Sequence, residues 1–247
     1  MTKYFYLLFF LVACNSKKKL LYQDSSEKYY VTIEKSEKNA VVDSLYTFYD
    51  FDNPSEIKEV GFYKDGFRND FWNYNLPTSV KTIKWGYYKD KYLNFETNMF
   101  AEADSTKYGD TFTKLLFTTD EGQVILTISI NGPAKDSIPE KNYERILKED
   151  FRLSEIIPME FCTKKIINKP NDIYINYITA KIISKNETRY LKQGFSFIDK
   201  NHFVEFGVSC GTKDNFYANI LFNAVLTNFS IDGKWLYNPF KNQNLTQ

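Results

Sequence analysis

The feature that most constrains the fold is a short aromatic motif that occurs twice. Gly61-Phe-Tyr-Lys-Asp-Gly66 recurs as Gly86-Tyr-Tyr-Lys-Asp-Lys91. Strand-like residues precede each copy, and aromatic side chains at alternate positions share one face of a strand. Lys64-Asp65-Gly66 predicts a tight turn, because glycine adopts positive φ without strain. A period of about 25 residues indicates stacked β-hairpins, which together bury what a single hairpin leaves exposed.

Residues 57–74 resemble a MORN-type repeat, in the variant with the pattern GxYKDGxxxGxW. Gly61, Tyr63, Gly66 and Trp72 match this pattern, as does the Lys-Asp pair before Gly66. Asp70 stands where this family has its second-half glycine, and Lys91 replaces the turn glycine in the second copy. The resemblance covers residues 43–97 and implies a short hairpin ribbon that serves as a scaffold or contact surface.

The rest of the chain combines strand-like runs with two helical patterns. Thr111–Thr119 and Gln123–Ile130 predict a hairpin across Asp120-Glu121-Gly122. One helix is expected at Ser137–Phe151 behind a capping box, and a second at Lys213–Asn228, capped by Thr212 or Asp214. Four further runs predict an antiparallel meander: Met159–Ile167, Asp172–Ser184, Thr188–Ile198 and His202–Cys210.

This order of elements resembles the PsbP-like α-β-α sandwich over residues 110–232, with Asn228-Phe229-Ser230 at the family's terminal "SF". The predicted fold class is therefore α+β and β-rich: a short antiparallel β-hairpin repeat, followed by an antiparallel sheet packed with two helices. The predicted organisation is a signal peptide (1–14), a tether (15–28), the hairpin region (29–100), a polar linker (101–110), the sandwich domain (110–232) and a tail (233–247).

The N-terminus carries a second informative pattern. Lys3 precedes a short apolar run, Tyr4–Ala13, that ends in Leu11-Val12-Ala13-Cys14. The run is shorter than the roughly 20 residues that a membrane-spanning helix needs, and it is typical of a secretory signal peptide. It resembles a bacterial lipoprotein signal, which implies that Cys14 is diacylated and becomes the first residue of the mature chain. A secretory signal with a coincidental cysteine is the alternative.

The predicted location follows from this anchor. The protein is expected in the cell envelope, attached by the lipid on Cys14 to a bacterial membrane, with the outer membrane preferred. The bilayer is thus the first predicted partner. One acyl chain holds a protein at a bilayer only marginally, whereas two chains anchor the protein stably, because each buried CH₂ contributes about 0.8 kcal/mol.

Composition argues against several classes of function. Lys+Arg is 32 and Asp+Glu is 31, which gives a net charge of +1 and no basic field that would attract nucleic acid. The single histidine, His202, lies in a polar break between strand-like runs and is expected to be a turn residue. Zinc clusters need several His or Cys ligands, a Ser-His-Asp or Cys-His device could use only His202, and no phosphate-loop signature is present. No cofactor is predicted.

Two cysteines remain after Cys14. An envelope compartment permits a disulfide between Cys162 and Cys210. The two lie in separate strand-like runs, so they can pair only if those strands are neighbours. The alternative is a pair of buried free thiols.

Three functions stay open at this stage. The leading hypothesis is a non-catalytic envelope lipoprotein that binds or scaffolds an unknown protein or glycan partner. An immunity or antitoxin-like lipoprotein that neutralises an envelope toxin is the second. A carboxylate-based hydrolase is the third and least favoured. Paired acids can work without histidine, and Asp50/Asp52 and Glu149/Asp150 are the candidates, but such acids are ordinary on surfaces and in turns.

The hairpin at 61–74 is the predicted contact surface. If one face of its strands packs on the neighbouring sheet, the other presents aromatic rings to solvent, and such patches mark interaction sites. The residues chosen are Tyr63, Arg68, Phe71 and Trp72. The alternative is that these rings pack only within the repeat and hold it together.

Replacement of the lipobox cysteine tests the anchor. Cys14→Ser removes the thiol that accepts the lipid, so the protein should move from the detergent phase to the aqueous phase and remain an unprocessed precursor. Phase partitioning and the mass of the mature chain measure both effects. Unchanged partitioning of Cys14→Ser would show that Cys14 is not the lipid attachment site.

Overall fold

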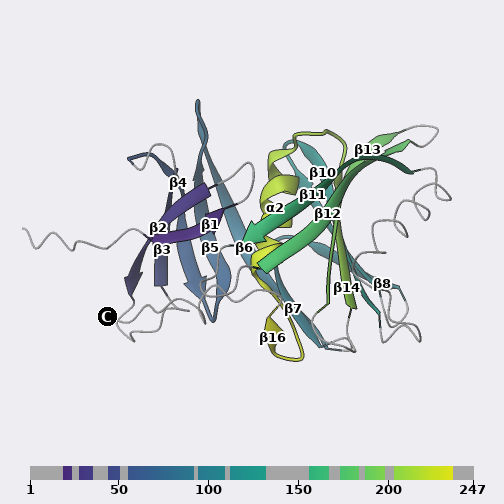
Figure 1. Cartoon of the computed structure of the whole chain (residues 1–247), viewed down its shortest axis with the longest axis horizontal. Helices are drawn as coiled ribbons and strands as arrows, with labels where there is room; N and C mark the ends of the chain where they lie inside the picture. The colour runs from purple at the N-terminus through teal and green to yellow at the C-terminus, as the bar shows by residue number, and fades with distance from the viewer. Residues whose placement is uncertain are drawn as a thin grey trace, which may run out of the picture.

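The computed structural model describes residues 19–23, 28–35, 44–50, 55–91, 94–108, 112–131, 156–166, 173–183, 187–197 and 203–235. These residues form two antiparallel sheets and one helix. Figure 1 shows the sheets side by side with the helix between them. Within these ranges, no helix has the length and apolar character that a bilayer crossing requires.

The nine-stranded sheet, called sheet A, has the order β1-β2-β3-β4-β5-β6-β7-β15-β16. Its strands are β1 (Lys19–Gln23), β2 (Lys28–Lys35), β3 (Ser44–Asp50), β4 (Ile57–Lys64), β5 (Phe67–Asn75), β6 (Val80–Asp90), β7 (Phe95–Phe100), β15 (Phe229–Ile231) and β16 (Lys234–Trp235). Sheet A is thus built mainly from the first half of the chain, and two late strands extend it beyond β7.

The seven-stranded sheet, called sheet B, has the order β11-β12-β13-β14-β10-β9-β8. Its strands are β8 (Asp104–Tyr108), β9 (Phe112–Thr119), β10 (Gly122–Asn131), β11 (Ile156–Ile166), β12 (Ile173–Ile183), β13 (Thr188–Phe197) and β14 (Phe203–Cys210). The predicted meander is present as β11 to β14, and the predicted hairpin as β9 and β10.

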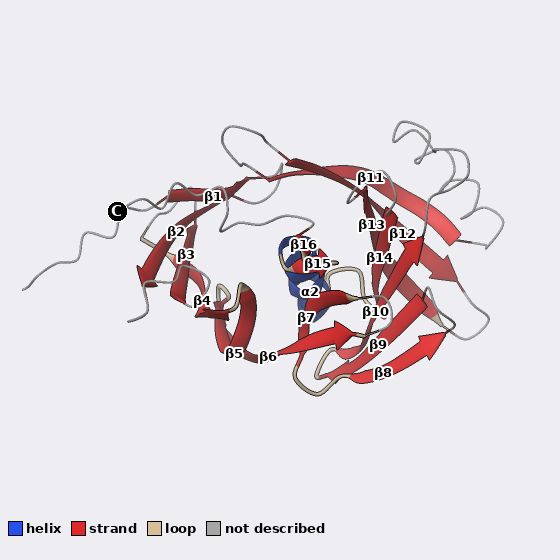
Figure 2. Ribbon diagram, turned by 90° about the horizontal axis from the view of Figure 1, so that it is seen from below, coloured by secondary structure: helices blue, strands red, loops and turns tan. Residues whose placement is uncertain are grey.

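The predicted fold class is wrong. The described chain is mostly β, and it forms two large sheets around one helix rather than an α-β-α sandwich with two helices. The helix α2 (Phe216–Thr227) packs against β14 and β10 of sheet B and against β7 of sheet A. Figure 2 shows both sheets curving around α2. The first predicted helix, at 137–151, lies outside the described residues.

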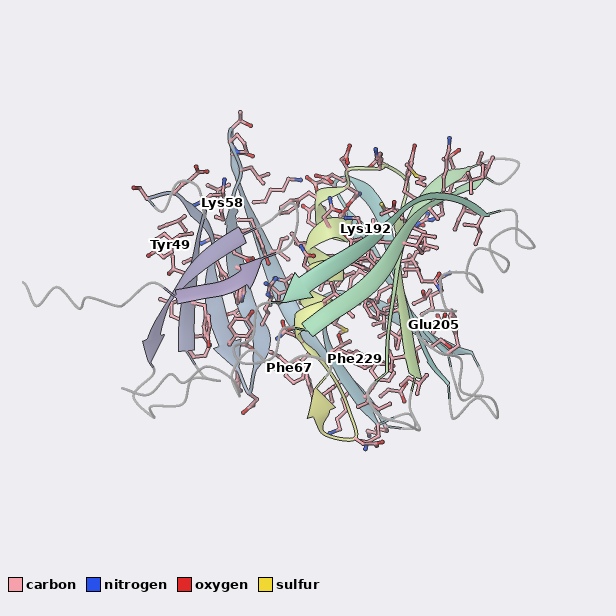
Figure 3. The ribbon with its side chains drawn as sticks, viewed as in Figure 1. Tyr49, Lys58, Phe67, Lys192, Glu205 and Phe229 are labelled. Atoms are coloured by element: carbon pink, nitrogen blue, oxygen red, sulfur yellow. The ribbon has the colours of Figure 1, made fainter. Side chains whose placement is uncertain are left out.

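The apolar stripe on α2 is wide because it meets both sheets. Leu221, Phe222 and Val225 are fully or almost fully buried, and they share one core with residues of sheets A and B. Phe229, which follows the helix, stacks on Phe95 with ring centroids 5.5 Å apart. Figure 3 shows Phe229 between the two sheets. One hydrophobic core therefore spans both sheets and the helix.

The start of α2 differs from the prediction in one detail. The N-cap is Asn215, whose side chain accepts a hydrogen bond from the Ala218 backbone N–H at 3.0 Å. Thr212 and Asp214, the predicted caps, are exposed residues of the preceding turn. Asparagine, aspartate and threonine are all good N-caps, so propensity alone did not discriminate among neighbouring candidates.

Three predicted boundaries also change. β1 lies in the segment predicted as a tether, and β8 lies in the predicted linker at 101–110. β15 pairs with β7 of the predicted hairpin region although it lies in the predicted sandwich domain, and β16, in the predicted tail, extends the same sheet. The chain therefore returns to sheet A at its end, which couples the two predicted domains.

The first aromatic motif forms the predicted hairpin. Asp65 and Gly66 connect β4 to β5 with φ values of 51° and 83°, the pair of positive angles that a type I′ turn requires. Asp70 also has a positive φ, 56°, at the position where MORN-type repeats carry glycine. Aspartate tolerates this conformation better than most residues, so the substitution keeps the local backbone geometry.

Gly61 and Trp72 form a matched pair inside this hairpin. Trp72 is fully buried, and its Nε1 donates to the Phe62 carbonyl at 3.1 Å. A Cβ on Gly61 would lie 2.1 Å from the indole ring, so only glycine leaves room for it. The pairing of β4 with β5 is irregular here. The longer segment Asn69–Asn73 of β5 lies opposite the shorter segment Val60–Phe62 of β4. The aromatic packing thus depends on the missing side chain at position 61.

A mutant cycle tests this pair. Trp72→Ala should destabilise the protein by about 3–5 kcal/mol through loss of a large buried ring. Gly61→Ala should cost about 1–3 kcal/mol by overpacking, but almost nothing when Trp72 is already alanine. Urea unfolding measures each value, and the exposed Phe71→Ala should change stability by less than about 0.5 kcal/mol. Additive costs of Gly61→Ala and Trp72→Ala would contradict the packing described.

Candidate functional site: a crevice where the sheets part

Strands β6 and β9 both extend past the strands that lie between them. β7 ends at Phe100, opposite Trp85, so the first residues of β6 have no partner from β7. β8 begins at Asp104, opposite Leu116, so the last residues of β9 have no partner from β8. Only the short turn 101–103 joins β7 to β8. The two sheets consequently separate between the start of β6 and the end of β9.

The hydrogen-bonding pattern shows which groups of β6 face this gap. Leu76 and Ser79 exchange both backbone hydrogen bonds across the β5–β6 turn, at 2.8 and 3.4 Å. Such pairs alternate with non-bonded pairs along an antiparallel ladder. The N–H and C=O groups of Val80, Thr82 and Lys84 therefore point away from β5. The Lys84 carbonyl confirms this direction, since it accepts from the Ala101 N–H at 3.0 Å.

A crevice of about 290 Å³ lies at this point. The buried side chains of Ile83, Phe100 and Phe117 line it together with Tyr217 of α2. Exposed polar residues line its rim: Thr82, Lys84, Glu102 and Thr118. The crevice thus combines an apolar lining from both sheets with hydroxyl and charged groups at its rim.

One of the most exposed apolar side chains lines the crevice, and another lies two residues before the rim residue Thr82 on β6. Phe71 lines the crevice and is 59% exposed, and Val80 begins β6 and is 62% exposed. The ammonium of Lys84 lies 5.5 Å from the centre of the Phe71 ring. Phe71 and Lys84 are directly opposite each other on β5 and β6, which places both on the same face of sheet A.

A charged cluster lies next to the crevice residues Thr82 and Thr119 along the chain. Lys81 of β6 forms ion pairs with Asp120 and Glu121 in the β9–β10 turn. Glu121 also accepts from the Phe216 N–H at 2.8 Å, at the first residue of α2. The hydrogen bond to Glu121 is the main cause that raises the pKa of Lys81. These contacts tie β6, the β9–β10 turn and the start of α2 to one another.

Of the predicted contact residues, only Phe71 is exposed. Tyr63 and Arg68 are buried and Trp72 is fully buried, so the expectation that these three face solvent is wrong. Tyr63 and Trp72 pack edge to face with centroids 5.1 Å apart. The structure therefore favours the alternative prediction for them, namely that their rings hold the repeat together. Partner contact by Phe71 stays a prediction.

Arg68 is buried among aromatic rings. Its guanidinium carbon lies 4.6 Å from the centre of the Trp72 ring and 5.4 Å from that of Trp85. Its nitrogens donate to Tyr74 Oη at 3.3 Å and to Glu59 Oε1 at 3.4 Å. The cation thus gains ring faces and polar partners in place of water, as a buried charge requires.

The titration of this cluster follows from its burial. Burial raises the pKa of Glu59, and the nearby Arg68 only partly offsets that effect. Burial alone would lower the pKa of Arg68, but Glu59 and the tyrosine hydroxyls outweigh it and raise the pKa. Arg68 is therefore a permanent cation within the aromatic cluster of sheet A. It is not one of the residues that line the crevice.

The predicted disulfide is wrong. Cys210 is a buried free thiol whose Sγ donates to the Thr212 carbonyl at 3.0 Å. β11, which carries Cys162, and β14 are separated in sheet B by β12 and β13. Neighbouring strands lie about 4.8 Å apart, so two intervening strands exceed the reach of a disulfide. Burial raises the pKa of the Cys210 thiol.

Several predicted residues lie outside the described part of the chain. Cys14, His202, Asp52, Glu149 and Asp150 are among them, and the side chains of Asp50 and Cys162 are not described either. Among the described residues, no group of three or more His, Cys, Asp or Glu is arranged to hold a metal ion.

Sequence reasoning missed most of the crevice. Lys81, Thr82 and Lys84 were not predicted as site residues, because alternating Lys and Thr are ordinary on a strand. Phe100 and Phe117 were expected in separate domains. The crevice could have been predicted only from the relative lengths of β6 and β7. Propensity alone does not locate the end of β7. Comparison with known proteins adds no homology to this picture: no family model and no curated protein matches the chain.

A matched pair of lysine variants tests the charged cluster. Lys81→Met removes the ion pairs but keeps most of the aliphatic stem, so it should destabilise the protein by about 1 kcal/mol. The effect should shrink in about 1 M salt, where exposed charges are screened. Lys84→Met on the same strand should change stability by less than about 0.5 kcal/mol. Equal costs for Lys81→Met and Lys84→Met, measured in urea, would contradict the role given to Lys81.

Proposed function

We propose that this protein is a membrane-anchored lipoprotein of the bacterial envelope that acts as a non-catalytic binding module, with the crevice between the sheets as its contact site. The sequence Leu11-Val12-Ala13-Cys14 supports the anchor. The exposed apolar side chains at the crevice support the binding role.

The observation that carries the proposal is the exposure of Phe71 and Val80 at this place. Large apolar side chains concentrated beside a concave, apolar surface usually mark an interaction site. While they are exposed, these side chains contribute none of the hydrophobic free energy that their burial would supply. A partner that covers them recovers that free energy on binding.

The arrangement assigns different tasks to the N-terminal anchor and to sheet A. The lipid on Cys14 keeps the protein at a membrane surface, where two acyl chains suffice for stable attachment. The buried cluster around Arg68 and Trp72 keeps sheet A rigid behind the crevice. A rigid surface loses little conformational entropy when a partner binds, which favours affinity.

Site-specific crosslinking in living cells tests the contact site. A photoreactive phenylalanine analogue at Phe71 should form a covalent adduct with one partner, identified by mass spectrometry. The same analogue at Ile183 is the matched control, because Ile183 is 47% exposed on β12 of sheet B and does not line the crevice. The proposal predicts an adduct at Phe71 and none at Ile183. No adduct at Phe71, or equal adducts at both positions, would contradict it.

A further inference from the structure

We infer that the partner of the crevice is an extended polypeptide segment that adds to the open edge of β6 as an antiparallel strand, with an acidic side chain that meets Lys84. This inference rests on the proposed function, because it names the kind of partner that the same site binds. It follows from unpaired backbone groups, from the charges at the rim and from the shape of the crevice.

The backbone of β6 supplies the first part of the argument. The β6–β7 ladder stops at Trp85↔Phe100, and Ala101 makes the last hydrogen bond, to Lys84. Beyond that point, the N–H and C=O groups of Val80 and Thr82 face the gap with no strand beside them in the described chain. A strand that continues the line of β7 would form about four backbone hydrogen bonds with these two residues.

The side chains at the edge specify which strand fits. A residue opposite Thr82 would place its side chain on the same outer face, diagonal to Lys84. An acidic residue there would pair with the Lys84 ammonium, which lies over the exposed Phe71 ring. A residue opposite Val80 would cover an exposed apolar side chain and is therefore expected to be apolar.

The alternate positions of the added strand point into the crevice. A residue opposite Ile83 would meet the rings of Phe100, Phe117 and Tyr217, so it is expected to be apolar as well. A residue opposite Lys81 would lie near the ion pairs with Asp120 and Glu121, which favours a polar side chain. Read from its N-terminus, the predicted segment is therefore apolar, acidic, polar, apolar.

The other charge at the rim agrees with this direction. Glu102 follows the last residue that bonds to β6, so it lies next to the N-terminal end of an antiparallel segment. Because Ala101 occupies the position opposite Lys84, a basic residue before the four-residue pattern would lie off the edge of β6, beside Glu102, and would complement its charge. Backbone pairing gives affinity and the alternating side chains give specificity, as in other proteins that bind a partner by strand addition.

Selection from a peptide library tests the inference on the full mature chain. The probe is a displayed library of random peptides of about ten residues, the length of a long strand. Enriched peptides should share the pattern apolar, acidic, polar, apolar. In hydrogen exchange, they should slow the amides of Val80 and Thr82 by about tenfold or more, while the amides of Lys81 and Ile83 change little.

Two substitutions at one position separate backbone pairing from side-chain contact. Thr82→Pro removes the amide that faces the gap but no bond to β5, so the sheet tolerates it as an edge position. It should weaken peptide binding by about tenfold, the value of one backbone hydrogen bond. Thr82→Ala keeps the amide and removes only the hydroxyl bond to Asn73, so it should weaken peptide binding far less than Thr82→Pro does. Unfolding curves show whether Thr82→Pro keeps the fold.

The exchange measurement keeps the inference testable if Thr82→Pro fails to fold. No enriched peptide, enriched peptides without the pattern, or peptides that leave Val80 and Thr82 unprotected would overturn the inference. If Phe71 still yields a specific adduct in cells, the proposed function stands and only the strand-addition mode is wrong. If Phe71 yields no adduct either, both the site and its mode of binding are wrong.

Discussion

The packing of α2 between two diverging sheets is the interaction on which the rest of the structure depends. Its side chains Leu221, Phe222 and Val225 contribute to one core that spans both sheets, and β15 continues directly from the helix into sheet A. Because α2 is packed between them, sheets A and B cannot come into contact with each other along the length of the helix. The crevice beside β6 is a consequence of this geometry.

The second constraint is the rigidity of the aromatic hairpin. Trp72 occupies the space above Gly61, and Arg68 contacts the rings of Trp72 and Trp85 and donates hydrogen bonds to tyrosine hydroxyls and to Glu59. A buried cation is costly when its partners are lost, so this cluster accepts few alternative arrangements. Phe71, on the exposed face of the same hairpin, and its cross-strand neighbour Lys84 on β6 are consequently presented in a fixed orientation to the crevice.

The sequence predicted local elements better than their assembly. The turn at Asp65-Gly66, the β9–β10 hairpin, the β11–β14 meander and the final helix all follow from short-range chemistry, and the structure contains them. Three outcomes depended on long-range packing, which local patterns do not encode. These are the pairing of β15 with β7, the separation of β11 from β14 that keeps Cys210 a free thiol, and the side of the hairpin on which Trp72 is buried.

The central claim is that β6 has an open edge where the two sheets part, and amide hydrogen exchange of the free protein tests it most directly. The amides of Lys81 and Ile83 face β5 and should exchange slowly, whereas the amide of Thr82, between them, should exchange about as fast as an unpaired amide. An alternation of fast and slow exchange along a single strand is a specific signature. Protection of Thr82 equal to that of Ile83 would show that the edge is already covered and would contradict the account.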